Sequence, residues 1–525
     1  MRLPFLRKTS GWLLLSALTS ACLAPEFRIA GGGSGGADTD GSGGEEDDGS
    51  GGAEEGSGGD TASGSTTGSG GDTDTGGTDT GGDEGTGGDD TSGGGDNGGG
   101  SGGDGSGGGP EQAILTGVET VGADCTVQTL PAFASLPTDA KFPDPFTTLD
   151  GAPVETLLDW ECRHREISAQ LQRYELGTKP EKPASVVGSL AGTTITVDLS
   201  DGSKSGQFTA TITYPTDGSP GPFPFVITLQ GSAGFAPARL QSLGVALVNF
   251  DVTGKIRSDD KDIDRAMGLF STFTGETDAG ALVAWAWGVS RLIDALEGLD
   301  EANLDVTRIG VGGCSRFGRG ALVAGALDAR ITLTVARETG TGGTGAFRAA
   351  AYENVDATVT CTDRISDPPT GCACTTAGDC AGTLEQTYSE ENWFSPAIEE
   401  FAGAVDRLPV DQHELMALVA PRPLVVIGND ALALLGRYSM AQGAHAAREV
   451  YQAMGVADRI GFVEQTGAHC SGTDNTGRTD DPYDATDAFV RRFLLGETAL
   501  STDFWDGDIS VDQARWIDWT TPSLE

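Results

Sequence analysis

The chain has few basic residues and very little histidine. Its 525 residues include 33 Lys and Arg against 77 Asp and Glu, which gives a formal net charge of −44, and it holds only four histidines. Because nucleic-acid binding requires basic patches that neutralise phosphates, this composition argues against a nucleic-acid partner. The four histidines are His164, His413, His445 and His469, so few positions could hold a histidine that acts as a base or as a metal ligand.

The N-terminal apolar run is too short to span a bilayer. Residues 1–22 nevertheless have the parts of an export signal. These are a positive region, the apolar run and a small-residue cleavage site: Arg2, Arg7 and Lys8, then Trp12 to Leu18, then Ser20 and Ala21. Cleavage before Cys22 would resemble a bacterial lipoprotein signal, with Cys22 as the lipidated residue. Thr19 stands where such signals usually carry leucine, so plain secretion remains the alternative.

Residues 31–109 contain no aromatic residue, lysine or arginine, and consist almost only of Gly, Ser, Asp, Glu and Thr. Such a segment cannot bury enough apolar surface to offset its conformational entropy. We therefore expect a flexible, self-repelling linker over residues 23–109. Residues 31–109 hold 18 of the 77 acidic residues, which leaves 59 acids against 33 bases in the rest of the chain. The acidity is thus not confined to the linker.

The remaining residues, 110–525, exceed a typical domain in length but contain no second low-complexity break and no internal repeat, so we expect one large domain. Apolar runs alternate there with helical patterns, which predicts a mostly parallel sheet of α/β class with helices on both faces. The predicted strands are 223–229, 245–252, 308–311, 331–336, 423–427 and 460–463, and the predicted helices are 281–296, 318–327, 439–454 and 485–494. Ligands bind such sheets at the carboxyl ends of the strands.

Eight cysteines accompany Cys22, and an even number in an exported protein predicts disulfides. They are Cys125, Cys162, Cys314, Cys361, Cys372, Cys374, Cys380 and Cys470. The cluster from Cys361 to Cys380 could alternatively bind zinc. No histidine lies near it and the compartment is oxidising, so disulfides are favoured and no metal is expected.

Ser315 is the candidate nucleophile. It lies in the glycine-rich segment Gly310–Gly320, between a predicted strand and a predicted helix. A nucleophile elbow needs this context, because the sharp turn lifts the hydroxyl above the sheet and requires small flanking residues. The usual spacing would place glycine at position 317, whereas here it comes at Gly318. The plainer alternative is an ordinary strand–helix turn; a dinucleotide loop is weaker still, because position 315 is not glycine.

His469 is the candidate base, because it follows the last predicted strand, where an α/β-hydrolase places its histidine after the nucleophile and the acid. His164 lies in a charged helical stretch and His445 on the predicted helix 439–454, so both are expected to be surface or packing residues. His413 begins a helical segment before Ala420 and is expected to be a structural hydrogen-bonding residue. Glu338 and Asp430 each follow a predicted strand in the interval where the acid belongs. The residues alone do not choose between these two carboxylates.

The segment Gly313–Gly318 resembles the glucuronoyl esterase family, the 4-O-methyl-glucuronoyl methylesterases. The resemblance extends over nearly the whole of residues 110–525. Its other motifs are Phe142–Phe146, Asp159–Cys162, Tyr174–Gly177, Ala286–Leu296, Arg337–Gly340, Glu391–Ser395, Asp411–His413 and His469–Cys470. It implies a three-layer α/β/α fold of the α/β-hydrolase type, a serine esterase activity, and no cofactor.

The resemblance also implies roles for individual residues. Ser315 is the nucleophile, His469 the base and Glu338 the acid, with Asp430 as the alternative acid because some bacterial relatives take theirs from the later loop. Arg316 matches the arginine that helps to bind the oxyanion. Two disulfides are implied, Cys314–Cys470 and Cys125–Cys162.

The sequence departs from the family pattern at positions expected to bind the sugar. Arg319 replaces the family's lysine, and Leu434 stands where the family has a sugar-stacking tryptophan. Gln386 and Glu390 fall near the family's other sugar contacts. A family cysteine is missing near Ala346–Phe347, and an insertion of roughly residues 352–382 holds four cysteines instead.

We therefore expect a serine esterase that cleaves the ester between glucuronic acid, with or without its 4-O-methyl group, of glucuronoxylan and a lignin alcohol. The expected enzyme is monomeric and is either secreted or held as a lipoprotein at the surface of a bacterium, so that it meets a membrane only through lipidated Cys22. Two alternatives remain: another carbohydrate esterase of acetyl or feruloyl type, or a non-catalytic carbohydrate-binding surface lipoprotein.

Overall fold

A computed structural model describes residues 115–230, 235–353, 381–470, 482–505, 509 and 511–524. The chain separates into two units, residues 26–104 and the remainder, and every described residue belongs to the second unit. The predicted signal (1–22), the predicted linker (23–109), and Cys22, Cys361, Cys372, Cys374 and Cys380 lie outside the described residues.

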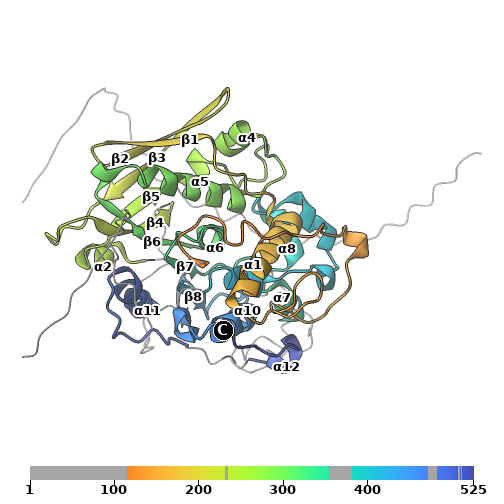
Figure 1. The fold of residues 1–525 in the computed structure, drawn as a ribbon. Coiled ribbons are helices and arrows are strands. Elements are labelled where there is room, and N and C mark those ends of the chain that lie inside the picture. The colour runs from red at the N-terminus through yellow and green to blue at the C-terminus, as the bar shows by residue number, and fades with distance from the viewer. Residues whose placement is uncertain are drawn as a thin grey trace, which may run out of the picture. The chain divides into compact units, whose positions relative to one another are not determined.

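In the described part of the chain, nine strands form one mixed sheet in the order β1-β2-β3-β5-β4-β6-β7-β8-β9 (Figure 1). Pairing is antiparallel from β1 through β3 to β5, and parallel among β5, β4, β6, β7, β8 and β9. The strands are β1 (Ser185–Ala191), β2 (Thr194–Asp201), β3 (Lys204–Thr213), β4 (Phe223–Leu229), β5 (Ala246–Phe250), β6 (Leu304–Cys314), β7 (Leu333–Arg337), β8 (Leu424–Asn429) and β9 (Ile460–Gln465).

Helices connect the strands and pack on the sheet (Figure 1). The α-helices are α1 (Leu157–Leu171), α2 (Pro237–Ser242), α3 (Val252–Lys255), α4 (Gly268–Thr274), α5 (Ala281–Leu296), α6 (Arg316–Leu327), α7 (Phe347–Glu353), α8 (Leu384–Glu390), α9 (Gln412–Ala417), α10 (Arg437–Ala453), α11 (Pro482–Phe489) and α12 (Gln513–Trp516). The 3-10 and π-helices are η2 (Phe133–Ser135), η3 (Gln172–Leu176), η4 (Asp300–Ala302), η5 (Pro396–Phe401), η6 (Val405–Arg407), η7 (Ala433–Leu435), η8 (Ala457–Arg459) and η9 (Val490–Leu494).

Two separate hydrophobic clusters show that both faces of the sheet are covered. Phe225 and Ile227 of β4 belong to the cluster that contains residues of α5, α6 and α10. Val226 between them belongs to the cluster that contains residues of α2, α11 and η9. Successive side chains of a strand point to opposite faces, so these two clusters are the two interfaces of a three-layer α/β/α sandwich. The predicted fold class is confirmed.

The parallel strands and the central helix follow from their apolar sequences. All residues of β7, β8 and β9 are buried, as expected for parallel strands that carry helices on both faces. Every residue of α5 is buried, and its bounds coincide with the predicted helix 281–296. Thr156 and Asp159 form a capping box at the N-terminus of α1.

The antiparallel edge formed by β1, β2 and β3 is the main part of the fold that the sequence did not predict. Buried and exposed residues alternate along β2 and β3, so these strands lack the long apolar runs that identified the parallel ones. No described helix has both the length and the apolar character needed to cross a membrane.

Candidate active site

The candidate catalytic residues follow the carboxyl ends of β6, β7 and β9 in the parallel part of the sheet, where α/β sheets bind their ligands. Ser315 directly follows β6, Glu338 directly follows β7, and His469 lies four residues beyond the end of β9. Between β7 and β9, the strand β8 ends at Asn429 and is followed by Asp430. The sheet therefore gathers residues that are up to 154 positions apart in the sequence.

Ser315 occupies a strained turn between β6 and α6. Its φ of 58° and ψ of −132° lie in a region that residues with a side chain rarely adopt. Glycine is required on both sides of it: a Cβ at Gly313 would lie 2.5 Å from the backbone of Phe317, and one at Gly318 would lie 2.7 Å from the carbonyl oxygen of Arg337. The unusual spacing of the second glycine is thus explained by the packing of α6 against the end of β7.

Positive φ values recur at this edge of the sheet. Glu338 has a φ of 46° and Cys470 a φ of 58°, so backbone strain occurs at or beside all three candidate catalytic positions. Such strain costs about 1–3 kcal/mol per residue and is found mainly at functional sites, where surrounding contacts hold it in place.

Glu338 and His469 are in direct contact. Oε2 of Glu338 lies 2.7 Å from Nδ1 of His469. The carboxylate is fully buried, whereas the histidine side chain is 41% exposed. The buried acid therefore supports an imidazole whose other side reaches towards solvent.

The charge of Glu338 fixes the tautomer of His469. Burial alone would raise the pKa of this carboxyl, but hydrogen bonds from His469 and from the N–H of Cys470, with the nearby positive charge of Arg337, outweigh it and hold the pKa below its usual range. An ionised Glu338 only accepts hydrogen bonds, so Nδ1 of His469 must carry its proton. In the neutral ring, Nε2 is then the unprotonated nitrogen and can act as a base.

Three further residues hold the carboxylate of Glu338, and sequence reasoning assigned none of them a role. Arg337 donates from Nε to Oε1 at 3.2 Å, Asn429 donates from Nδ2 to Oε2 at 3.3 Å, and Gln465 donates from Nε2 to Oε1. Gln465 also accepts a hydrogen bond from Arg337. All three are the last residues of their strands, β7, β8 and β9, which is the one signal that could have identified them.

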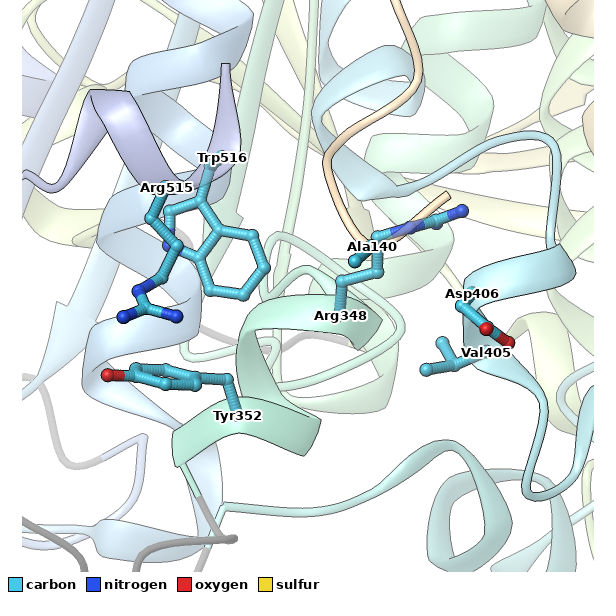
Figure 2. Close-up of a pocket in the computed structure, with 7 residues that line it drawn as sticks. All are labelled: Ala140, Arg348, Tyr352, Val405, Asp406, Arg515 and Trp516. Atoms are coloured by element: carbon cyan, nitrogen blue, oxygen red, sulfur yellow. The ribbon is translucent and has the colours of Figure 1, made fainter. Parts of the chain in front are cut away.

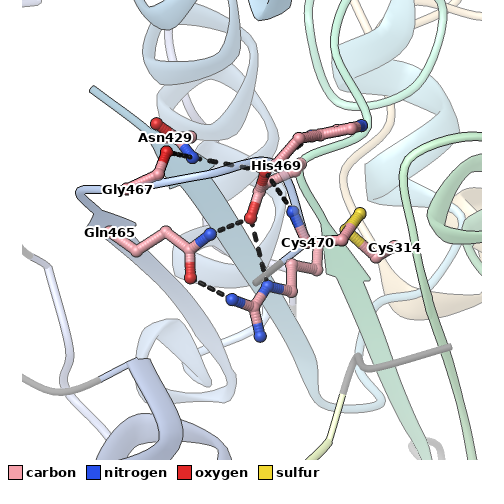
Figure 3. The surroundings of a disulfide bond; sticks show 8 residues. Cys314, Asn429, Gln465, Gly467, His469 and Cys470 are labelled. Atoms are coloured by element: carbon pink, nitrogen blue, oxygen red, sulfur yellow. Dashed lines mark hydrogen bonds and ion pairs between the residues drawn. A yellow bond between two sulfur atoms is a disulfide. The ribbon is translucent and has the colours of Figure 1, made fainter. Parts of the chain in front are cut away.

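A disulfide joins the nucleophile turn to the histidine loop. Cys314, at the end of β6, is bonded to Cys470, which follows His469 (Figure 3). The sulfur atoms lie within 4.8 Å of the ligand atoms of Glu338 and His469, but as a disulfide they offer no thiolate to a metal ion. The second expected pair, Cys125–Cys162, is also bonded.

The alternative acid, Asp430, and the other three histidines form hydrogen bonds with residues other than Glu338 and His469. Asp430 accepts a hydrogen bond from the hydroxyl of Thr466 at 2.9 Å. His164 and His413 are buried and bonded to backbone carbonyl oxygens, and burial lowers the pKa of each to about 4. His445 accepts a hydrogen bond from the indole of Trp505, and its pKa is likewise lowered to about 4 by burial.

The residues expected to contact the sugar lie in different settings. Nε of Arg319 donates to the carbonyl oxygen of Thr339 at 2.7 Å, and its guanidinium lies 4.2 Å from the centre of the Trp393 ring. Burial lowers the pKa of Arg319 to about 10, and the nearby negative charge of Glu390 partly offsets this effect. Glu390 is exposed at the end of α8. Gln386 is exposed, and its Oε1 accepts the N–H of Thr383 in the cap of α8.

Leu434 is half exposed, in η7, beside the described end of the insertion. The N–H of Gly382 donates to the carbonyl oxygen of Leu434 at 3.0 Å. The other described end, at Glu353, accepts the N–H of Ser439. Both ends of the insertion therefore contact the segment that follows β8, although its cysteines lie outside the described residues.

A pocket of about 290 Å³ has a different set of lining residues, which Figure 2 shows. On one side, the guanidinium of Arg515 lies 4.1 Å from the centre of the Tyr352 ring. Arg348 is bonded to backbone carbonyl oxygens and to Asp411. The pocket is lined by Ala140, Arg348, Tyr352, Val405, Asp406, Arg515 and Trp516. None of the candidate catalytic residues lines it, so we do not place the reaction there.

Known proteins resemble this chain over most of its folded part. The family model described as "Glucuronyl esterase, fungi" matches residues 197–367 and 371–455. The 4-O-methyl-glucuronoyl methylesterase of Hypocrea jecorina is 39% identical over 404 residues, which are 77% of this chain and 80% of that protein. The protein of the same name from Schizophyllum commune is 37% identical over 401 residues, which are 75% and 94% of the two chains.

Solved structures of glucuronoyl esterases are also similar to this chain. The glucuronoyl esterase catalytic domain from Hypocrea jecorina has a TM-score of 0.65 at 38% identity and covers 75% of this chain and 100% of its own. A Ser-to-Ala variant of the enzyme from Sporotrichum thermophile, in complex with methyl 4-O-methyl-β-D-glucopyranuronate, has a TM-score of 0.65 at 34% identity, with coverage of 76% and 100%. This chain belongs to the glucuronoyl esterase family of carboxylic ester hydrolases, which have the α/β-hydrolase fold.

Proposed function

We propose that this chain hydrolyses the ester between glucuronic acid, with or without its 4-O-methyl group, of glucuronoxylan and an alcohol of lignin. Ser315 is the nucleophile, His469 the general base and Glu338 the acid that orients it. The observation that carries this proposal is the hydrogen bond between Glu338 and Nδ1 of His469 at the same sheet edge as the strained turn of Ser315.

The first half of the reaction forms an acyl-enzyme. Nε2 of His469 takes the proton of the Ser315 hydroxyl as Oγ attacks the carbonyl carbon of the uronate ester. Glu338 stabilises the imidazolium that results. Arg316 helps to hold the oxyanion of the tetrahedral intermediate, and loss of one such donor typically costs about 10²–10³ in rate. The intermediate then expels the alcohol, which leaves with the proton from Nε2.

The second half repeats these steps with water. His469 accepts a proton from the water molecule that attacks the acyl carbonyl, and the proton returns to Oγ of Ser315 as free uronate leaves. The buried, ionised Glu338 keeps the same tautomer of His469 available for both halves. No cofactor takes part in this scheme.

We assign sugar binding to Arg319, Glu390, Gln386 and Leu434. In the described part of the chain, Nη1 of Arg319 is buried and has no protein hydrogen-bond partner, which leaves a donor for a sugar hydroxyl or carboxylate. Gln386 offers its amide N–H groups as donors, while its oxygen already accepts one hydrogen bond in the cap of α8. Leu434 offers an apolar contact in place of an aromatic platform.

The experiment that tests this function compares ester substrates with the purified protein. We expect hydrolysis of methyl or benzyl glucuronate, and little release of acetate from acetylated xylan or of ferulate from feruloyl esters. Preference for either of the latter would favour the other esterase types. An absence of turnover on all of them would favour a carbohydrate-binding lipoprotein.

We also propose that the protein is exported as a monomer and is held at the bacterial surface through Cys22, with secretion as the alternative. The support is the sequence of residues 1–22 and the acidic linker that follows. Lipidation of Cys22 predicts that Cys22→Ser moves the protein from the membrane fraction to the soluble fraction. An unchanged distribution would favour secretion.

A further inference from the structure

Arg316 is held from one side by Asp259. It is the first residue of α6, directly after Ser315, and its side chain is 40% exposed. Nη1 lies 3.3 Å from Oδ2 of Asp259, and the guanidinium carbon lies 5.3 Å from the centre of the Phe317 ring. Among the described residues Asp259 is the ion-pair partner of Arg316, and the charge of Glu391 also lies near it. A guanidinium has five N–H donors, so donors remain for a substrate.

Asp259 is itself fixed in place. Only 4% of the residue is exposed, and its Oδ2 accepts a hydrogen bond from Nε1 of Trp393 at 2.8 Å. Its carbonyl oxygen accepts the N–H of Asn392 at 2.7 Å, and the N–H of Lys261 donates to the carboxylate of Glu391 at 3.0 Å. A buried carboxylate with such partners is a rigid ion-pair partner for the guanidinium of Arg316.

Trp393 connects this carboxylate to the second arginine of α6. The residue is 5% exposed, and its ring lies 4.2 Å below the guanidinium of Arg319 while its N–H is bonded to Asp259. Arg316 and Arg319 are three positions apart and therefore share one face of the helix. One indole and one carboxylate thus support both cations next to the nucleophile.

We propose that Asp259 is a positioning residue for Arg316, which it keeps oriented towards the oxyanion, and that Trp393 fixes Asp259 for this task. The inference rests on the proposed function. A flexible arginine beside Ser315 would have to be ordered during the reaction, whereas a preoriented one carries no such cost. Because the oxyanion is absent from the bound substrate and forms only as the tetrahedral intermediate is approached, loss of Asp259 should lower kcat rather than raise KM.

The test is a double-mutant cycle between Asp259→Asn and Arg316→Ala on benzyl glucuronate. Asp259→Asn keeps an oxygen for the indole N–H of Trp393 but removes the charge that holds Arg316. We expect kcat to fall about tenfold or more, the usual scale for loss of an interaction with a charged group, and KM to change less than about twofold. In the Arg316→Ala background, Asp259→Asn should have almost no further effect.

Asp260→Asn is the matched control. It removes the same charge from the next residue, which is exposed, and should leave kcat within about twofold. If Asp259→Asn fails to fold, Trp393→Phe replaces it, because it frees Asp259 without touching Arg316 and should again lower kcat only when Arg316 is present. An equal loss in both backgrounds overturns the proposal. A wild-type protein without activity on the ester overturns the proposed function instead.

Discussion

Oε2 of Glu338 lies 2.7 Å from Nδ1 of His469, although 131 positions separate the two residues in the sequence. Asn429, Gln465, Arg337 and the N–H of Cys470 donate to the same carboxylate. The acid is therefore tied to the ends of three strands and to the histidine loop. Its orientation towards His469 is thus fixed by the fold itself.

Ser315→Ala should abolish ester hydrolysis and leave the fold intact, because the substitution removes only the nucleophilic oxygen. Turnover of methyl glucuronate should fall by well over about a hundredfold, the scale of nucleophile loss in a serine triad. The thermal midpoint of unfolding should match that of the wild type. A variant that keeps more than about one hundredth of the wild-type rate would remove Ser315 from this role.

Glu338→Ala should damage turnover far more than Asp430→Ala. The first variant removes the partner that fixes the tautomer of His469, and comparable losses in serine triads reach about 10⁴ in kcat. The carboxylate of Asp430 accepts a hydrogen bond from Thr466. Its loss should therefore mainly affect the conformation of the loop that contains Asp430. The measurement is kcat for both variants; greater damage from Asp430→Ala would mean that the later loop supplies the acid.

The bond between Cys314 and Cys470 should support both stability and activity. Non-reducing peptide mapping should find these cysteines joined, and free thiols at both positions would contradict this. Replacing both with serine should lower the free energy of unfolding by about 2–4 kcal/mol and also lower kcat, because the bridge joins the neighbours of Ser315 and His469. The matched control is Cys125 and Cys162: the same replacement there should cost stability with little change in kcat.

The pH dependence of stability should reflect Glu175. Burial raises the pKa of this carboxyl to about 8, partly offset by a hydrogen bond from Gln412 and reinforced by the charge of Asp411. The folded protein therefore binds this proton more tightly than the unfolded chain does. Its contribution to the free energy of unfolding is fully present below about pH 4.5 and is lost as pH rises towards 8, by up to about 1.4 kcal/mol per pH unit.

Urea unfolding at pH 5, 6, 7 and 8 measures this contribution. Glu175→Gln stays uncharged, so its free energy of unfolding minus that of the wild type should rise as pH rises, whereas Glu301→Gln, at an exposed position, should run parallel to the wild type. Other buried groups titrate in the same range, because burial raises the pKa of Glu414 to about 8 and lowers the pKa of three histidines to about 4: His164, His413 and His445. They are present in both proteins and cancel in the difference. Parallel curves for Glu175→Gln and the wild type would show that Glu175 does not titrate in this range.

The surroundings of Glu338 show which parts of the site the sequence could predict and which it could not. Strand ends and chain order predict Ser315 and His469, but Glu338 and Asp430 both follow strands, and only the family motif favours Glu338. Asn429 and Gln465 could not be predicted as its partners, because contacts across 91 and 127 positions depend on strand register. Asp259 lies between the predicted elements, in a segment without periodicity, and only the folded structure brings it to Arg316.

Arg319 and Leu434 should set the preference for the 4-O-methyl group. Arginine presents a planar fork of donors where lysine offers a point charge, and Arg319 lies with one guanidinium face against Trp393 and Nε bonded to Thr339. Leu434 lacks the stacking face of a tryptophan and is half exposed beside Gly382. We therefore expect activity on glucuronate esters, with weaker dependence on decoration of the sugar than in the fungal-type enzymes.

The measurement is kcat/KM on benzyl glucuronate with and without the 4-O-methyl group, for the wild type, Arg319→Lys and Leu434→Trp. Leu434→Trp should raise the ratio in favour of the methylated substrate, because an aromatic face orients the ring that carries the methyl group. Arg319→Lys should change the ratio as well, because a lysine cannot keep both the contact with Trp393 and the donor directed at the sugar. If neither substitution changes the ratio, these positions do not determine specificity, and Leu434 does not occupy the place of the family's tryptophan.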